Sequence, residues 1–239
     1  MKKKGGESML YIASDLHGEY RLFRALLDKI AFSSSDRMIV CGDVIDKGEE
    51  PVRLLRFVLG EPNIDLILGN HEAEFLKYYR ALMREHARDF GKVLSLLSEY
   101  FPTDGALLDW ETVDALETLP LYMEEEDFLC VHAGAPIGAD GHLLPLSEAS
   151  TEELVYDRRF KDPYVRHEDA RCVFFGHTET AAIAGEPRIL VYRREKGAAP
   201  RSVRDFYKIH LDTGAWSRGV MGCFCVDTLK AHYVRKKMV

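Results

Sequence analysis

Histidine and carboxylate side chains recur in this sequence where short apolar runs end. Five segments have this form, and they are Ser14-Asp15-Leu16-His17-Gly18, Gly42-Asp43-Val44-Ile45-Asp46-Lys47-Gly48, Gly69-Asn70-His71-Glu72, Val131-His132-Ala133-Gly134 and Gly176-His177-Thr178. Imidazole and carboxylate groups together suit Mn, Fe or Zn, because calcium prefers cages built from oxygen alone. The residue types therefore predict a transition-metal site, whose candidate ligands are Asp15, His17, Asp43, Asn70, His132 and His177.

The apolar runs before these segments are predicted strands. In the first part of the chain strands and amphipathic helices alternate, in the order strand Met9–Ala13, helix Glu19–Ile30, strand Arg37–Cys41, helix Pro51–Leu59 and strand Ile64–Leu68. This order favours parallel strands joined by helical crossovers. Because ligands bind at the carboxyl ends of strands in open α/β sheets, we expect the five segments to converge on one edge.

The rest of the chain divides into a helical middle and a strand-rich end. Residues 72–119 have a helical pattern that Pro102-Thr103-Asp104-Gly105 interrupts. The later predicted strands are Phe128–Val131, Cys172–Phe175, Arg188–Val191, Phe206–Leu211 and Cys223–Leu229. Because the five motifs lie on both sides of the helical middle, it is predicted to be an insertion. We therefore expect one domain over residues 9–239, preceded by a flexible extension at residues 1–8.

Composition limits the classes of function. The chain has 239 residues, of which 46% are hydrophobic and 30% charged, as in a globular protein. Its net charge of −7 argues against nucleic-acid binding. No apolar run approaches the ~20 residues of a membrane helix, and no secretory signal follows the basic start. Five cysteines without a paired framework indicate reduced thiols, so a cytoplasmic location is predicted.

The motifs GDVIDKG, GNHE and GHT together resemble the phosphoprotein-phosphatase branch of the calcineurin-like metallophosphoesterases, and specifically its short bacterial and phage members. The resemblance extends from about Met9 to about Leu229. It includes the stretch 209–214, Ile-His-Leu-Asp-Thr-Gly, which is similar to a strand that follows GHT in bacterial members. The family's fold implies an α/β sandwich of two mixed β-sheets flanked by helices.

The resemblance also implies a centre of two divalent metal ions, expected to be Mn²⁺ with Fe or Zn as alternatives. It assigns two overlapping ligand sets: Asp15, His17 and Asp43 for the first metal, and Asp43, Asn70, His132 and His177 for the second. In such a site a metal-bridging hydroxide attacks phosphorus directly, so no protein nucleophile is required.

The same resemblance assigns roles to the neighbouring residues. His71 is the expected general acid, and Asp46 is expected to hold it through a hydrogen bond. Lys47 stands where family members have arginine, so it supplies a point charge in place of a bidentate fork. Arg158 and Asn70 are the other expected phosphate-binding residues.

These features predict a metal-dependent phosphomonoesterase acting on phosphoserine or phosphothreonine in proteins. One alternative is a symmetrical dinucleoside polyphosphate hydrolase, such as one for diadenosine tetraphosphate. The stretch 135–138, Ala-Pro-Ile-Gly, has no aromatic residue nearby, which disfavours adenine stacking there. A small-phosphoester phosphatase and a non-catalytic metal-binding module are the further alternatives. The expected partner is thus a phosphorylated protein or small phosphoester, without nucleic acid or membrane.

Overall fold

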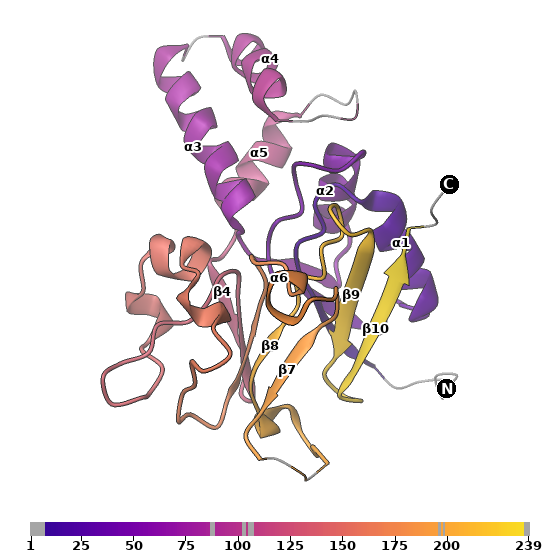
Figure 1. The fold of residues 1–239 in the computed structure, drawn as a ribbon. Coiled ribbons are helices and arrows are strands. Elements are labelled where there is room, and N and C mark those ends of the chain that lie inside the picture. The colour runs from indigo at the N-terminus through magenta and orange to yellow at the C-terminus, as the bar shows by residue number, and fades with distance from the viewer. Residues whose placement is uncertain are drawn as a thin grey trace.

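The computed structural model describes residues 8–86, 89–101, 104, 108–195, 197 and 199–236, and contains two five-stranded sheets (Figure 1). The first sheet has the order β10-β9-β1-β2-β3. Its strands are β1 (Leu10–Ala13), β2 (Arg37–Val40), β3 (Ile64–Leu66), β9 (Val220–Cys225) and β10 (Lys230–Arg235). Strands β1, β2 and β3 are parallel, whereas β9 is antiparallel to both β1 and β10.

The second sheet has the order β4-β5-β6-β8-β7. Its strands are β4 (Tyr122–Glu124), β5 (Phe128–Val131), β6 (Cys172–Phe175), β7 (Leu190–Arg193) and β8 (Phe206–His210). The central strands β5, β6 and β8 are parallel, and the edge strands β4 and β7 are antiparallel to their neighbours. Both sheets are therefore mixed, as predicted.

The two sheets pack against each other through one apolar layer. Ile12 and Ile39 of the first sheet belong to the same buried cluster as Phe128 and Phe174 of the second. The residues flanking Ile12 point the other way, into the core beneath the helices. Because strands buried on both faces need apolar residues at every position, these strands are continuous apolar runs and do not alternate. The predicted fold, an α/β sandwich of two mixed sheets flanked by helices, is confirmed.

Helices cover the outer face of the first sheet. The crossover helices α1 (Tyr20–Lys29) and α2 (Pro51–Gly60) connect β1 to β2 and β2 to β3. Helix α1 buries Phe23 and Leu26, which lie on one side at helical spacing. The shorter helical segments are α6 (Ala181–Ala184), η1 (Leu146–Glu148), η2 (Glu152–Tyr156), η3 (Arg159–Lys161) and η4 (Val203–Asp205).

The predicted helical middle consists of α3 (Asn70–Glu85), α4 (Phe90–Tyr100) and α5 (Trp110–Glu117), which project from one end of the sandwich (Figure 1). Helix α3 begins two residues earlier than predicted, with Gly69 as its N-cap. Three of the four residues of the predicted break, 102, 103 and 105, lie outside the described residues, as do residues 1–7 of the predicted extension. A single domain over 9–239 stays a prediction.

Some strand boundaries differ from the sequence prediction. The predicted strand 223–229 is replaced by β9, which begins at Val220, and by the unpredicted β10. Strand β10 is only partly buried along its length, so it carries a weak apolar signal, and its pairing with β9 holds it in the sheet. The prediction for residues 188–191 is two residues out of position, because β7 covers Leu190–Arg193.

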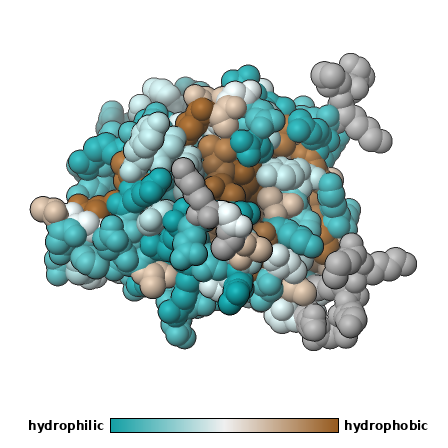
Figure 2. Space-filling view, turned by 60° about the horizontal axis from the view of Figure 1, so that its bottom comes forward, coloured by the Kyte–Doolittle hydropathy of each residue, from teal (hydrophilic) through white to brown (hydrophobic). Residues whose placement is uncertain are grey.

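One face of the molecule is mainly polar. Figure 2, in which the bottom of Figure 1 comes forward, shows mostly hydrophilic side chains there, with the largest apolar area near the middle. No helix in the described part of the chain has the length and apolar character to cross a membrane.

Candidate metal and phosphate site

The loops after β1, β2, β3, β5 and β6 bring the predicted site residues to one edge of the sandwich. Eight of them line one cavity of about 220 Å³: Asp15, His17, Asp43, Lys47, Asn70, His71, Arg158 and His177. His132 lies fully buried beside this cavity, and Asp46 contacts it through His71. This arrangement agrees with the prediction that the five segments converge on one edge.

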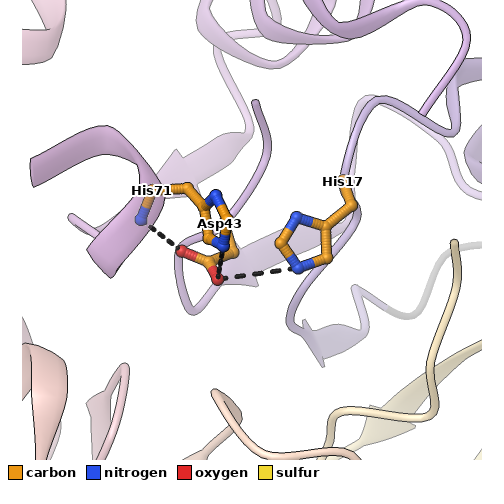
Figure 3. Close-up of side chains that lie close together, drawn as sticks. All are labelled: His17, Asp43 and His71. Atoms are coloured by element: carbon orange, nitrogen blue, oxygen red, sulfur yellow. Dashed lines mark hydrogen bonds and ion pairs between the residues drawn. The ribbon is translucent and has the colours of Figure 1, made fainter. Parts of the chain in front are cut away.

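The carboxylate of Asp43 lies between two groups of histidines. Its Oδ2 is 3.6 Å from Nε2 of His17 and 3.8 Å from Nε2 of His71, and Figure 3 shows this group. Its Oδ1 is 3.4 Å from Nε2 of His132. Two potential metal-binding groups, one with His17 and His71 and one with His132 and His177, thus share Asp43.

Asn70 joins the second group. Its Oδ1 is 2.8 Å from Nδ1 of His177 and 3.0 Å from Nε2 of His132, and the two ring nitrogens are 3.2 Å apart. Asp15 lies at the other side of the site, with Oδ1 4.0 Å from Nε2 of His17. The backbone N–H of His177 donates to both carboxylate oxygens of Asp15.

Backbone carbonyls fix the tautomer of each histidine that was predicted as a metal ligand. Nδ1 of His132 lies 2.8 Å from the carbonyl of Cys41, and Nε2 of His177 lies 3.1 Å from that of Tyr156. Nδ1 of His17 faces the carbonyl of Ile45 at 3.4 Å. A nitrogen that faces a carbonyl must carry the proton, so the other nitrogen of each ring presents its lone pair to the site.

The charges of these groups also fit a divalent cation. Burial lowers the pKa of His177 to about 3, and it lowers the pKa of His132 and His17. The imidazoles are therefore neutral and able to act as ligands. Burial raises the pKa of Asp15 to about 6 and also raises the pKa of Asp43. A bound cation would therefore offset the free-energy cost of keeping these buried carboxylates charged. This donor set of neutral imidazoles, an amide oxygen and buried carboxylates fits a transition metal.

The backbone of the site is strained. Eight non-glycine residues in the described part of the chain have positive φ, and six of them belong to the predicted site: Asp15, His17, Asp43, Asp46, Lys47 and His177. Such conformations are costly and persist where the surrounding structure enforces them, often at functional sites.

Glu72 supplies part of this enforcement. Its side chain is fully buried, and its carboxylate accepts hydrogen bonds from the backbone N–H groups of Asp43, Val44, Ile45 and Gly69 at 2.8–3.0 Å. The sequence places Glu72 only at the start of the predicted helical stretch 72–119. Its further role depends on a loop 27 to 29 residues earlier in the chain, which local sequence does not reveal.

His71 and Asp46 form a direct pair. Nδ1 of His71 is 2.7 Å from Oδ2 of Asp46, and Nε2 faces Asp43. Although burial opposes the charged form, the hydrogen bond to Asp46 and the charge of Asp43 raise the pKa of His71. The hydrogen bond from His71 in turn lowers the pKa of Asp46.

Two basic side chains face the same cavity. Nζ of Lys47 is 3.1 Å from Nε2 of His17, which places a positive charge against the inward lone pair of that ring. Nη1 of Arg158 donates to Oγ1 of Thr178 at 2.9 Å and to the carbonyl of His177 at 3.3 Å. Buried Lys208 supports the segment after Arg158, because its Nζ donates to the carbonyls of Phe160 and Asp162.

The cavity is also lined by residues that were not predicted to belong to the site: Glu179, Asp212, Gly214, Trp216 and Ser217. They belong to the loop of His177 and to the loop that contains and follows the Asp-Thr-Gly motif. That motif contributed to the resemblance, so it could have drawn attention to this loop.

Comparisons with known proteins agree with a phosphoesterase fold. The model of the family described as calcineurin-like phosphoesterase matches residues 9–186. Among solved structures, a putative diadenosine tetraphosphatase has a TM-score of 0.67 at 17% identity, covering 95% of this chain and 93% of that one. A serine/threonine phosphatase from Saccharomyces cerevisiae has a TM-score of 0.56 at 15% identity, covering 98% and 82%. At these identities the likeness shows the fold alone.

Curated relatives are similar over part of the chain. A symmetrical bis(5'-nucleosyl)-tetraphosphatase from Methylococcus capsulatus is 33% identical over 130 residues, which are 53% of this chain and 43% of that protein. The protein of the same name from Aromatoleum aromaticum is 35% identical over 130 residues, which are 52% and 44%. The match thus spans less than half the length of these relatives.

These relatives correct the predicted substrate. The prediction of a serine/threonine protein phosphatase, and of that branch of the family, is wrong, because the curated relatives are named symmetrical bis(5'-nucleosyl)-tetraphosphatases. The quoted motifs do not separate the two activities, because they supply metal and phosphate ligands, which both reactions require. The lack of an aromatic residue near 135–138 in the sequence does not exclude a dinucleotide, because Trp216 lines the cavity.

Proposed function

The chain belongs to the calcineurin-like phosphoesterase family, and on this premise we propose that it hydrolyses dinucleoside tetraphosphates symmetrically, giving two nucleoside diphosphates. The observation that carries a phosphoesterase activity is the pair of ligand groups that share Asp43 within one polar cavity. The names of the curated relatives supply the substrate class.

Of the clustered residues, we assign Asp15, His17 and Asp43 to one divalent cation and Asp43, Asn70, His132 and His177 to the other, as the resemblance implies. His71, which also lies in the group with His17 and Asp43, is kept for proton transfer because its Nδ1 pairs with Asp46. When bound, two cations in these places would lower the pKa of a water molecule and neutralise charge on the phosphate oxygens. We expect Mn²⁺, with Fe or Zn as alternatives, because the ligands mix imidazole nitrogen with oxygen.

Lys47 and Arg158 are suited to bind the phosphate chain. Both line the cavity, and the planar guanidinium of Arg158 can contact two oxygens at once, whereas the ammonium of Lys47 provides a point charge. The Oδ1 of Asn70 faces His132 and His177, so its amide N–H₂ is the group left to donate to a phosphate oxygen.

His71 is placed to act as a general acid. Asp46 fixes its Nδ1, and Nε2 faces the cavity side of Asp43. A nucleoside diphosphate is a weaker base than an alkoxide, because the second pKa of a phosphate is about 6. Protonation by His71 therefore matters less for a dinucleoside tetraphosphate than for an alkyl phosphate.

The test is a parallel assay of metal-stripped protein after addition of Mn²⁺. Diadenosine tetraphosphate and a phosphoserine peptide are supplied at equal concentration, and nucleotides are separated by chromatography. The proposal predicts ADP as the sole nucleotide product and a larger kcat/KM for the dinucleotide. Formation of ATP with AMP, or preference for the peptide, contradicts it.

A further inference from the structure

The rim of the cavity carries an aromatic side chain that the proposed chemistry does not use. Trp216 is 50% exposed and lines the cavity together with His17, His71 and Arg158. The chain has two tryptophans, and the other, Trp110, is 60% exposed at the first residue of α5 and is not among the residues that line this cavity.

The loop that presents Trp216 is held by its own hydrogen bonds. The N–H of Gly214 donates to Oδ1 of Asp212 at 2.9 Å, and the N–H of Arg218 donates to the carbonyl of Gly214 at 2.8 Å. Gly214 has a φ of 73°, which favours glycine at this turn. Oγ1 of Thr213 donates to the carbonyl of Val220 at 2.8 Å and so connects the loop to β9.

Glu179 connects the same loop to the metal-ligand loop. It follows His177 by two residues, and its two carboxylate oxygens accept from Oγ of Ser217 at 2.5 Å and from Nε of Arg218 at 3.1 Å. Both residues directly after Trp216 are therefore fixed relative to His177. A surface that is already ordered loses little entropy when a ligand binds to it.

The size of the cavity determines where the ends of the substrate lie. At about 220 Å³ it is smaller than the ~300–1,000 Å³ of pockets that enclose a drug-sized ligand. Its inner wall consists of the polar and charged residues of the metal and phosphate site. The phosphates of a dinucleoside tetraphosphate can occupy this space, and the nucleosides must lie at the rim.

We propose that the indole ring of Trp216 is the stacking surface for a nucleobase of the dinucleotide. This inference rests on the proposed function. A half-exposed aromatic ring beside a phosphate site offers what a base requires, because every base has a π-face that stacks on such a ring. Stacking does not read the edge of the base, so diadenosine and diguanosine tetraphosphates are expected to have similar KM values.

The first test compares substrates with and without a base. In Trp216→Ala, the ratio of kcat/KM for diadenosine tetraphosphate to kcat/KM for p-nitrophenyl phosphate is expected to fall about tenfold, as loss of one base–aromatic stack implies. Trp216→Phe is expected to recover most of the ratio. Trp110→Ala is the matched control and should keep the wild-type ratio.

A spectroscopic test does not depend on turnover. In Trp110→Phe the tryptophan fluorescence, excited at a wavelength that the tyrosines do not absorb, comes from Trp216 alone. With Mn²⁺ present, ADP is expected to quench it and pyrophosphate to leave it unchanged. If the wild-type protein hydrolyses diadenosine tetraphosphate but Trp216→Ala keeps its ratio and ADP does not quench, the stacking role is wrong. If the wild-type protein hydrolyses p-nitrophenyl phosphate but not the dinucleotide, the proposed function fails.

Discussion

At the scale of single residues, the site depends on which nitrogen of each histidine is free. His17, His132 and His177 each direct one nitrogen to a backbone carbonyl and the other into the site. His71 differs, because its Nδ1 faces the carboxylate of Asp46 and its pKa is raised. The first three are thus suited to bind a cation, and His71 is suited to give up a proton.

This difference leads to a prediction for His71→Asn. The variant should keep its bound metal and lose about 10²–10⁴-fold in kcat on β-glycerophosphate, whose leaving alkoxide needs a proton. The loss should be much smaller on p-nitrophenyl phosphate and diadenosine tetraphosphate, which have better leaving groups. Steady-state kinetics on the three substrates measure the effect. Equal losses on all three would exclude the general-acid role.

The sequence anticipated these residues because each of them stands in a short motif after an apolar run. Asp15, Asp43 and His177, although distant in sequence, lie where the strand-end rule places them. Trp216 and Glu179 were not anticipated, because their relation to the site depends on the packing of two loops. Local sequence motifs reveal side chains that can do chemistry, but they do not reveal which distant loops pack around those side chains.

At the scale of elements, Glu72 connects helix α3 to the loop after β2. Its carboxylate accepts hydrogen bonds from four backbone N–H groups, so the start of α3 and the loop that contains Asp43 are held together. This arrangement explains how several residues with positive φ can be held close together.

We therefore predict that Glu72→Gln destabilises the fold. The glutamine amide has one acceptor oxygen where the carboxylate has two. Its N–H₂ group faces backbone N–H donors and cannot accept from them, so some buried N–H groups lose their hydrogen-bond partner. The free energy of unfolding should fall by about 3 kcal/mol. Urea denaturation of the metal-stripped protein measures it. Glu111→Gln, at an exposed residue of α5, is the control and should change stability by less than about 0.5 kcal/mol.

The sequence predicted the central elements better than the edges. Strands such as β1, β2, β5 and β6 are buried on both faces, so their apolar runs are unambiguous. Strand β10 was missed because Lys230, His232 and Arg235 give it a mixed composition. Its place in the sheet comes from pairing with β9, which is a tertiary contact.

At the scale of the whole molecule, stability should depend on pH through a buried histidine that is not a proposed metal ligand. His210 at the end of β8 is fully buried, stacks on Phe175 with ring centroids 4.2 Å apart, and has its pKa lowered by burial to about 3. Below its unfolded pKa of about 6.5, the unfolded chain binds a proton that the folded chain does not. Stability therefore falls as the pH falls below about 6.5.

Between pH 6.5 and pH 5 this single group should lower the free energy of unfolding by about 1.6 kcal/mol, because the slope rises from half to nearly all of about 1.4 kcal/mol for each pH unit. His210→Phe keeps an aromatic ring but has no group that binds a proton. Over this pH range its free energy of unfolding should therefore fall less than that of the wild type, and the difference should equal the contribution of His210. Urea denaturation at the two pH values tests this. If His210→Phe loses as much stability as the wild type over this range, His210 is not the group responsible.

The whole molecule places its chemistry at one end of the sandwich, close to the projecting helices α3, α4 and α5 (Figure 1). Tyr156, just before Arg158, donates from its hydroxyl to Oε1 of Glu74 on α3 at 2.9 Å. Helix α3 is thus connected to the segment that carries Arg158, which we proposed to bind phosphate. Variation in this insertion is therefore expected to affect the choice of substrate.

The most direct test of the account is the number of metal ions that the shared carboxylate supports. Mn²⁺ is titrated into metal-stripped wild type and Asp43→Asn, with bound metal counted by mass spectrometry and diadenosine tetraphosphate hydrolysis followed on the same samples. Asp114→Asn, at an exposed carboxylate of α5, is the control. We predict two ions per chain in the wild type and the control, with activity that rises as the second ion binds. Asp43→Asn should lose at least one ion and at least about 10³-fold in activity, because the ligand common to both groups becomes a neutral amide. Full activity with one ion per chain, or an Asp43→Asn variant that keeps both ions and its activity, would contradict the account.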